Sequence, residues 1–137
     1  MTFESFQGCL WNIGFYEDET SIIHSYHITL NDPWFDYVKS GVKKYEGRCY
    51  WRSVLKYQIN DELKISHHTN PSKESYTVKI KNILVYPTFE EALKTLPLKE
   101  VLPGVSTIEE GIDIYLKFVR LETQLNYGVC MIEVEPI

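Results

Sequence analysis

A short stretch of the chain concentrates side chains that could bind or transform an anionic ligand. Lys43 follows a glycine turn at Gly41, and Glu46 and Arg48 follow the lysine in the next five residues. Lysine offers a compact positive charge, whereas the planar guanidinium of arginine can grip a phosphate or stack on a base. A strand over 43–51 would place Glu46 and Arg48 on one face, with roughly 7 Å between their Cα atoms. At that separation they could share a ligand or pair with each other as a structural ion pair.

The charge of the chain is concentrated around the same stretch. The 137 residues carry a formal net charge of −5, but the segment 39–56 holds six basic residues and one acidic residue. Its net charge is therefore +5, and the remainder of the chain carries −10. Such a distribution indicates a local anion site rather than a coat for a long polyanion, the alternative being a solvated surface. The basic residues are Lys39, Lys43, Lys44, Arg48, Arg52 and Lys56.

Histidine and cysteine are poorly spaced for metal or thiol chemistry. His67 and His68 precede a polar loop, and no histidine combines with cysteine or acid at the spacing of zinc ligands. We therefore expect no metal site and no cofactor. The three cysteines form no CxxC pair and are odd in number, which is typical of a reducing cell interior. Strand parity indicates that Cys49 is a buried, inert thiol.

The elements before and within the charged stretch can be read from the local pattern. Alternating apolar residues from Tyr26 to Leu30 predict a strand with one buried face. Asp32 is a suitable N-cap and Pro33 a suitable first helical residue, which predicts a short helix to Ser40. Gly41 ends this helix, and the strand 43–51 follows.

The remainder of the chain predicts strands followed by helices and a last strand. Strands are expected after Asn60 and over 76–86, and a terminal strand over 127–135. Capping boxes at Thr88 and Thr107 predict two helices. The order β-α-β-β-β-α-α-β indicates an α+β fold, a small β-barrel flanked by helices.

Length and composition favour one domain. Hydrophobic residues make up 44% and charged residues 24%, as in globular proteins, and no apolar run is long enough to span a membrane. Residues 1–24 contain no secretory signal, so we expect an intracellular protein, cytoplasmic or nuclear, with no membrane partner. That aromatic-rich N-terminal extension either adds strands packed on the domain formed by 25–137 or is an interface for a homodimer or another protein partner.

The pattern P-W-F-D-x-x-x-S-G-x-K-x-x-E-G-R over residues 33–48 resembles the ASCH domain family. The turn at 59–63 and the later blocks at 83–91, 115–118 and 127–129 also resemble the family. The resemblance covers about 25–135. It implies a PUA-like fold, that is, a small mixed or antiparallel β-barrel flanked by helices.

The resemblance also implies a cleft between barrel and helices that binds RNA or a nucleotide-like ligand. Carried onto this chain, the cleft residues are Lys43, Glu46 and Arg48. Trp34 and Tyr50 are candidate stacking partners for a base, although Trp34 is equally suited to the helix–barrel core. The favoured function is therefore a binding module for RNA or a modified nucleotide.

Two enzymatic alternatives and a non-enzymatic one stay open. One branch of these domains hydrolyses N4-acetylcytidine with a G-x-K-x-x-T motif, in which Lys43 matches but Glu46 replaces the threonine. The branch's downstream glutamate aligns near Gly104 here. A carboxylate does not replace a hydroxyl nucleophile, which counts against this chemistry. A ribonuclease could use Lys43 and Glu46 as catalytic groups, with Arg48 as an anion stabiliser. The third alternative is a protein-interaction module.

Overall fold

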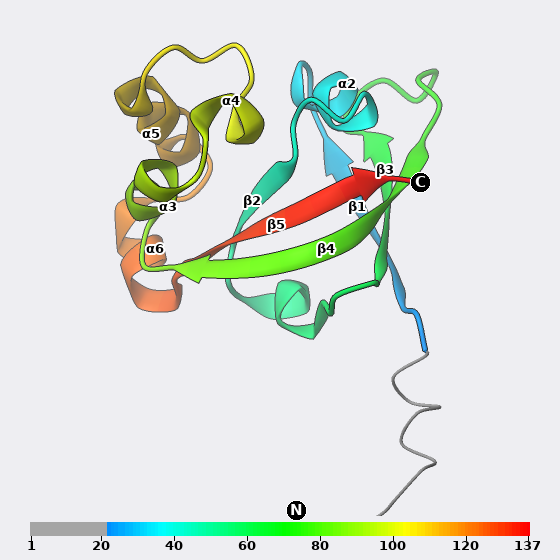
Figure 1. Ribbon diagram of the computed structural model, residues 1–137, viewed down its shortest axis with the longest axis horizontal. Coiled ribbons are helices and arrows are strands. Elements are labelled where there is room, and N and C mark those ends of the chain that lie inside the picture. Colours follow the sequence, from blue (N-terminus) through cyan, green and yellow to red (C-terminus); the bar gives the residue numbers. More distant parts are fainter. Residues whose placement is uncertain (1–21) are drawn as a thin grey trace, which may run out of the picture.

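The computed structural model describes residues 22–137, and one curled, half-barrel sheet organises them (Figure 1). Its five strands run in the order β1-β3-β4-β5-β2. The β1–β3 pair is parallel, and the other three pairs are antiparallel. The strands are β1 Ser25–Leu30, β2 Tyr45–Cys49, β3 Glu62–His67, β4 Tyr76–Tyr86 and β5 Val129–Pro136. The α+β class expected from the sequence is confirmed.

Most helices gather beyond one end of the sheet, whereas α2 lies near its other end (Figure 1). The helices are α2 Trp34–Lys39, the 3-10 helix η1 Arg52–Lys56, α3 Phe89–Thr95, α4 Leu98–Val101, α5 Ile108–Leu116 and α6 Leu121–Tyr127. The predicted caps are confirmed, because the Thr88 and Thr107 side chains accept hydrogen bonds from the Glu91 and Glu110 amides. Helices η1, α4 and α6 were not predicted, since none of them has a side-chain cap that would mark its start.

The start of α2 differs from its prediction. Pro33 rather than Asp32 holds the N-cap position, and no side-chain cap forms. The Asp32 carboxylate instead lies 3.2 Å from His67 Nε2 and 3.5 Å from Lys73 Nζ. Asp32 therefore ties the start of α2 to the end of β3 and to the loop that follows it, rather than capping the helix. The predicted helix end is confirmed, because Gly41 follows the last turn with φ of +84°.

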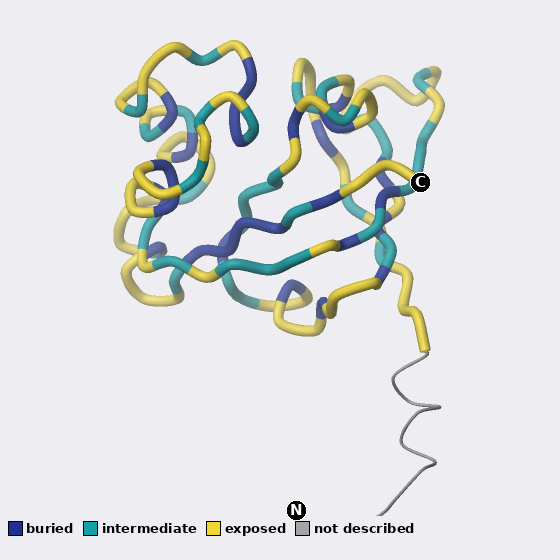
Figure 2. Tube along the Cα trace, viewed as in Figure 1, coloured by how far each residue is buried: buried dark blue, intermediate teal, exposed yellow. Residues whose placement is uncertain are grey.

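Two hydrophobic cores lie on either side of β5 (Figure 2). The barrel core packs α2 and η1 inside the curled sheet, and it includes Cys130, Ile132 and Val134, as the sequence predicts. The helical core packs α3, α4 and α5 against the sheet and includes Val129 and Met131. Because β5 is buried on both faces, the barrel and the helical layer form one packed body.

The N-terminal extension falls almost entirely outside the described residues, so its predicted packing or interface role stays a prediction. Ile22 and Ile23, the first residues described, are exposed. Within residues 22–137, no helix has the length and apolar character needed to cross a membrane.

Candidate functional site

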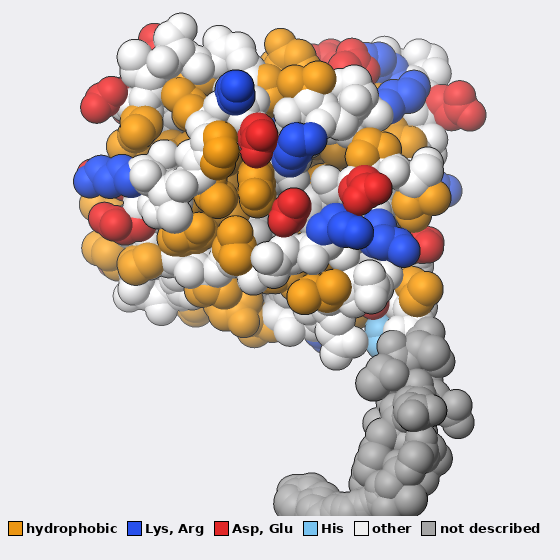
Figure 3. Space-filling model, viewed as in Figure 1, with side chains coloured by type: hydrophobic (Ala, Val, Ile, Leu, Met, Phe, Trp, Pro, Cys, Tyr) orange, Lys and Arg blue, Asp and Glu red, His pale blue; other side chains and the backbone are white. Residues whose placement is uncertain are grey.

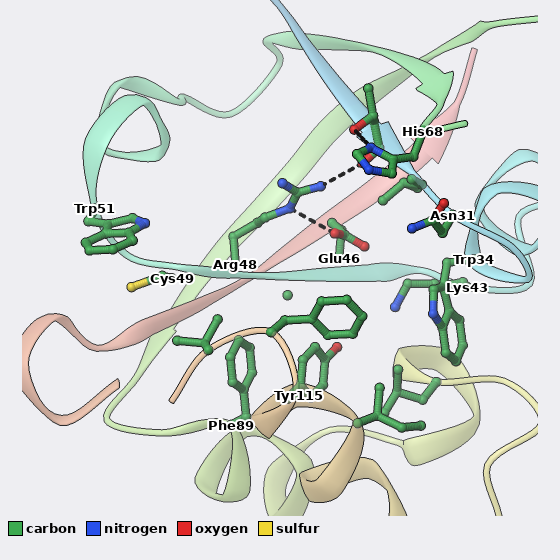
Figure 4. Close-up of a pocket in the computed structure, with 17 residues that line it drawn as sticks. Asn31, Trp34, Lys43, Glu46, Arg48, Cys49, Trp51, His68, Phe89 and Tyr115 are labelled. Atoms are coloured by element: carbon green, nitrogen blue, oxygen red, sulfur yellow. Dashed lines mark hydrogen bonds and ion pairs between the residues drawn. The ribbon is translucent and has the colours of Figure 1, made fainter. Parts of the chain in front are cut away.

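A cavity of about 450 Å³ runs along β2, between the end of β1 and the helices α3 and α5 (Figure 4). Lys43, Glu46 and Arg48 all line it, together with Trp34 from the start of α2. The structure thus brings together four of the five residues that the sequence singled out. Its size falls within the range of roughly 300–1,000 Å³ that is usual for small-molecule sites.

Lys43 is the buried cation of the cavity. The residue is only 2% exposed, and its Nζ donates a hydrogen bond to the Val101 carbonyl oxygen. The same nitrogen lies 5.4 Å from the centre of the Trp34 ring, within reach of a cation–π interaction. Burial lowers the pKa of Lys43 from 10.5 to about 8, although the charge of Glu46 acts in the opposite direction. The ammonium group is thus placed where its desolvation is only partly compensated.

Glu46 and Arg48 form an ion pair that also lines the cavity. Arg48 Nε donates to Glu46 Oε2 at 2.9 Å, and a terminal guanidinium nitrogen donates to the Thr29 carbonyl at 3.3 Å. These contacts fix the guanidinium plane without using all of its five N–H donors. The side chain of Arg48 stays 33% exposed and that of Glu46 12%. The pairing that the sequence allowed is therefore present, and a ligand could still contact both partners.

The helical wall of the cavity approaches β2 closely at Gly47. A Cβ atom there would lie 2.8 Å from Phe89 Cε1 and 2.9 Å from the Tyr115 hydroxyl oxygen. The two rings stack with their centres 4.0 Å apart and an angle of 6° between their planes. The Tyr115 hydroxyl is buried and has no hydrogen-bond partner among residues 22–137. Burial raises the pKa of Tyr115 well above 10, so the group is neutral.

Tyr50 lies elsewhere than the predicted stacking position. Its ring packs against the barrel core, and it is not among the cavity-lining residues. Strand β2 ends at Cys49, so the alternation that would place Tyr50 beside Arg48 does not continue to it. Trp51, the next residue, lines the cavity instead. Strand alternation indicates an aromatic residue at this end of β2, but it does not identify which of the two adjacent aromatic residues faces the cavity.

The basic segment separates in space. Of its six cations, only Lys43 and Arg48 line the cavity, whereas Lys44 lines a separate hollow with Lys99 and Glu100. On the face drawn in Figure 3, basic and acidic side chains are interspersed rather than gathered by sign. The cavity therefore holds two of the six cations, and the +5 of the segment does not form one continuous patch.

The cavity also includes residues that sequence reasoning missed. Thr29 and His68 border it, with Thr29 Oγ1 3.2 Å from His68 Nδ1. Neither residue lies near Lys43 in the sequence. The parallel pairing of β1 with β3 brings Thr29 and His68 together. Tyr115 was expected only as a core position of a helix.

Metal and thiol chemistry have little support in the described part of the chain. No group of three or more histidine, cysteine or acidic residues there could hold a metal ion. Cys49 is buried as predicted, and burial raises its thiol pKa. Burial also raises the pKa of Cys130 to about 12. Both thiols are thus protonated, weak nucleophiles near neutral pH.

Comparison with known proteins gives a family match and several similar structures. The ASCH domain family profile matches residues 28–137. The crystal structure of hypothetical protein PH0355 is 34% identical, with a TM-score of 0.73, and the match covers 82% of this chain and 99% of that one. The solution structure of protein PF0455 from Pyrococcus furiosus is also 34% identical, with a TM-score of 0.68 and coverage of 82% and 97%.

A more distant structure agrees with these in fold. A mutant of ZmASCH from Zymomonas mobilis is 14% identical, with a TM-score of 0.54, and the match covers 81% of this chain and 73% of that protein. At this identity the likeness concerns the fold alone, and it confirms the predicted PUA-like architecture. A search of curated protein sequences found no significant match.

Proposed function

The chain belongs to the ASCH domain family, and from that premise we propose that its cavity binds a nucleotide, either free or as part of an RNA strand. The observation that carries the proposal is the convergence of a buried ammonium, an arginine–glutamate pair and an indole on one cavity of about 450 Å³. That volume suits one base with its sugar. The charges of Lys43 and Arg48 suit a ligand that carries phosphate.

Each side chain has a chemical role in this proposal. The Trp34 ring borders the cavity and offers a face on which a base can stack, an interaction worth about 1–3 kcal/mol per base. Arg48 is held by Glu46 and Thr29, so its remaining N–H donors are directed before a phosphate arrives. The second carboxylate oxygen of Glu46 can accept a hydrogen bond from a base. Lys43 can donate to a carbonyl or phosphate oxygen from within the cavity.

The acidic residue that lines the cavity, Glu46, favours binding over hydrolysis. Glu46 is the only carboxylate among its lining residues in the described chain, and it is paired with Arg48. Gly104, where the amidohydrolase branch has a glutamate, lines the separate hollow with Lys44. Glu46 Oε2 already accepts a hydrogen bond from Arg48 Nε, so this oxygen is not free to take a proton from an attacking water. Hydrolysis of an acetylated cytidine or of RNA is therefore the second candidate.

Calorimetric titration with the four common nucleoside 5′-monophosphates at fixed salt tests the proposal. We expect binding by the native protein and a loss of at least tenfold in affinity for both Lys43→Met and Arg48→Ala. Lys44→Met is the matched control, because Lys44 is adjacent in sequence but exposed and outside the cavity. Equal affinities in the native protein, Lys43→Met and Arg48→Ala would contradict the proposal.

The same samples distinguish binding from turnover. Incubation with N4-acetylcytidine and with labelled RNA is expected to leave both intact. Product formation by the native protein that disappears in Glu46→Gln would establish hydrolysis in place of simple binding.

A further inference from the structure

The cavity has a second indole at the end away from Trp34. Trp34 lies beside Lys43, which precedes β2, whereas Trp51 follows β2, and both line the cavity. Figure 4 shows the two indoles at opposite ends, with Arg48 and Glu46 between them. The five residues of β2 rise by about 13–17 Å. The two aromatic surfaces are therefore too far apart for a single base to contact both.

Trp51 belongs to a small aromatic and cationic cluster. The Arg52 guanidinium carbon lies 4.1 Å from the centre of the Trp51 ring, and the Tyr127 ring centre lies 4.9 Å from it. Trp51 is half-buried, whereas Arg52 is exposed and Tyr127 is 52% exposed. We call these three residues the Trp51 platform. Of the three, Trp51 lines the cavity, and Arg52 and Tyr127 extend the platform onto the exposed surface.

The backbone at Arg52 supports a role for its side chain. Arg52 has φ of +56°, in the left-handed region that favours glycine. An arginine thus stands where the backbone favours a residue without a side chain. No ion-pair partner holds its guanidinium within residues 22–137, so the group is available over the Trp51 ring. Backbone outliers of this kind gather at functional sites.

We propose that the Trp51 platform is a second base-stacking subsite, so that the site takes a single RNA strand of at least two nucleotides. This inference rests on the proposed function, since the first base occupies the Trp34 end. The second base stacks on Trp51 or on the guanidinium of Arg52, both of which are common base-stacking surfaces in RNA-binding proteins. Arg48, between the two ends, and Arg52 contact phosphates. A single strand is required, because bases paired in a duplex are not exposed to stack on side chains.

The number of phosphate contacts makes the proposal quantitative. Two contacts predict that the logarithm of the binding constant for a single strand falls with the logarithm of salt concentration with a slope of about −1.4. Removal of one contact reduces that slope by about 0.7. A general polyanion coat would give a much steeper dependence.

The test compares a uridine pentanucleotide with uridine 5′-monophosphate on the full chain. The pentanucleotide is expected to bind the native protein about 5- to 150-fold more tightly, the range expected for one additional stacked base. Trp51→Ala should lower pentanucleotide affinity more than monophosphate affinity, so that the ratio of the two affinities falls toward one, whereas Trp51→Phe should retain most of the ratio. Trp34→Ala should weaken both ligands.

Arg52→Gly provides a variant that should fold well, since glycine suits the positive φ. It is expected to lower pentanucleotide affinity and to reduce the salt slope, whereas Lys44→Met changes neither. Equal affinity of the native protein for the two ligands would overturn the second subsite and leave the proposed function standing. An equal loss for both ligands in Trp51→Ala would also overturn it. Failure of both ligands to bind would overturn the proposed function and this inference together.

Discussion

Among residues 22–137, two charged side chains are buried almost completely, and their surroundings differ. Asp61 has a side chain only 2% exposed at the turn before β3. One of its carboxylate oxygens accepts a hydrogen bond from the His24 amide at 3.0 Å, and the other accepts from the Gln58 amide at 2.9 Å. Lys43, equally buried, donates to one carbonyl oxygen and faces a cavity.

The difference separates a structural charge from one that is available to a ligand. Both oxygens of Asp61 have backbone donors, so its burial is compensated by contacts that also fix the turn and the start of β1. Lys43 has three N–H donors and one acceptor from the protein, and burial lowers its pKa. A buried charge that lacks full compensation and borders a cavity is typical of a functional site.

The largest expected effect on stability comes from Asp61. Asp61→Ala leaves two partly buried backbone amides, those of His24 and Gln58, without acceptors, which should lower the free energy of unfolding by about 3 kcal/mol. Urea unfolding followed by circular dichroism measures this change. Nucleotide affinity per folded molecule should stay as in the native protein. A loss below about 1 kcal/mol would contradict the structural role assigned to Asp61.

Lys43→Met should show a different dependence on pH. The lysine in the unfolded chain has a pKa near 10.5, whereas the folded pKa is about 8, so the unfolded state binds more protons between these values. The native protein should therefore gain stability relative to Lys43→Met as pH rises from about 8 to 10.5, by up to about 3 kcal/mol. Below pH 8 the lysine is charged in both the folded and the unfolded state, so burying the charge lowers the stability of the native protein by its full amount.

Unfolding curves of the native protein and Lys43→Met at pH 7, 8.5 and 10 measure this difference. Other groups that titrate in the same range are common to both proteins, so they cancel in the comparison. At pH 7 the variant should be at least as stable as the native protein, in contrast to Asp61→Ala. If the stability difference between the native protein and Lys43→Met did not change with pH, burial would not lower the pKa of Lys43 as described.

Two tyrosine hydroxyls, one partly buried and one fully buried, give the smallest expected effect and extend the same contrast. The Tyr76 hydroxyl donates to the Phe35 carbonyl oxygen at 2.6 Å, whereas the Tyr115 hydroxyl has no partner within the described chain. Tyr76→Phe should therefore lower the free energy of unfolding by about 1 kcal/mol. Tyr115→Phe should change it by a few tenths or raise it slightly, because it removes an uncompensated polar atom. Equal losses in the two variants would indicate a partner for Tyr115.

The local patterns that predicted much of the fold are those with a short-range physical cause. The alternation up to Leu30, the threonine caps at Thr88 and Thr107 and the turn glycine at Gly41 each act within a few residues. The cap predicted at Asp32 was wrong because its carboxylate is drawn to His67 and Lys73, which lie far along the chain. A local sequence pattern cannot show that a distant histidine and lysine compete with the helix for this carboxylate.

The candidate site likewise divides into residues that local patterns predict and residues that depend on long-range packing. Lys43, Glu46 and Arg48 could be predicted because they occupy one strand and the turn before it. Tyr115 could be predicted as buried from its helical spacing, but its approach to Gly47 depends on how α5 packs on β2. Tyr50 failed as a cavity residue because β2 ends before it, which the sequence does not mark.

The central claim is that a nucleotide binds in the cavity lined by Lys43 and not beside the buried carboxylate of Asp61. The most direct test is a series of ¹H–¹⁵N correlation spectra recorded during addition of a nucleoside monophosphate. The amides of Lys43, Gly47 and Arg48 should shift with one common dissociation constant, while those of Gln58 and Asp61 stay in place. Shifts confined to the region of Asp61, or an absence of shifts at saturating ligand, would contradict the claim.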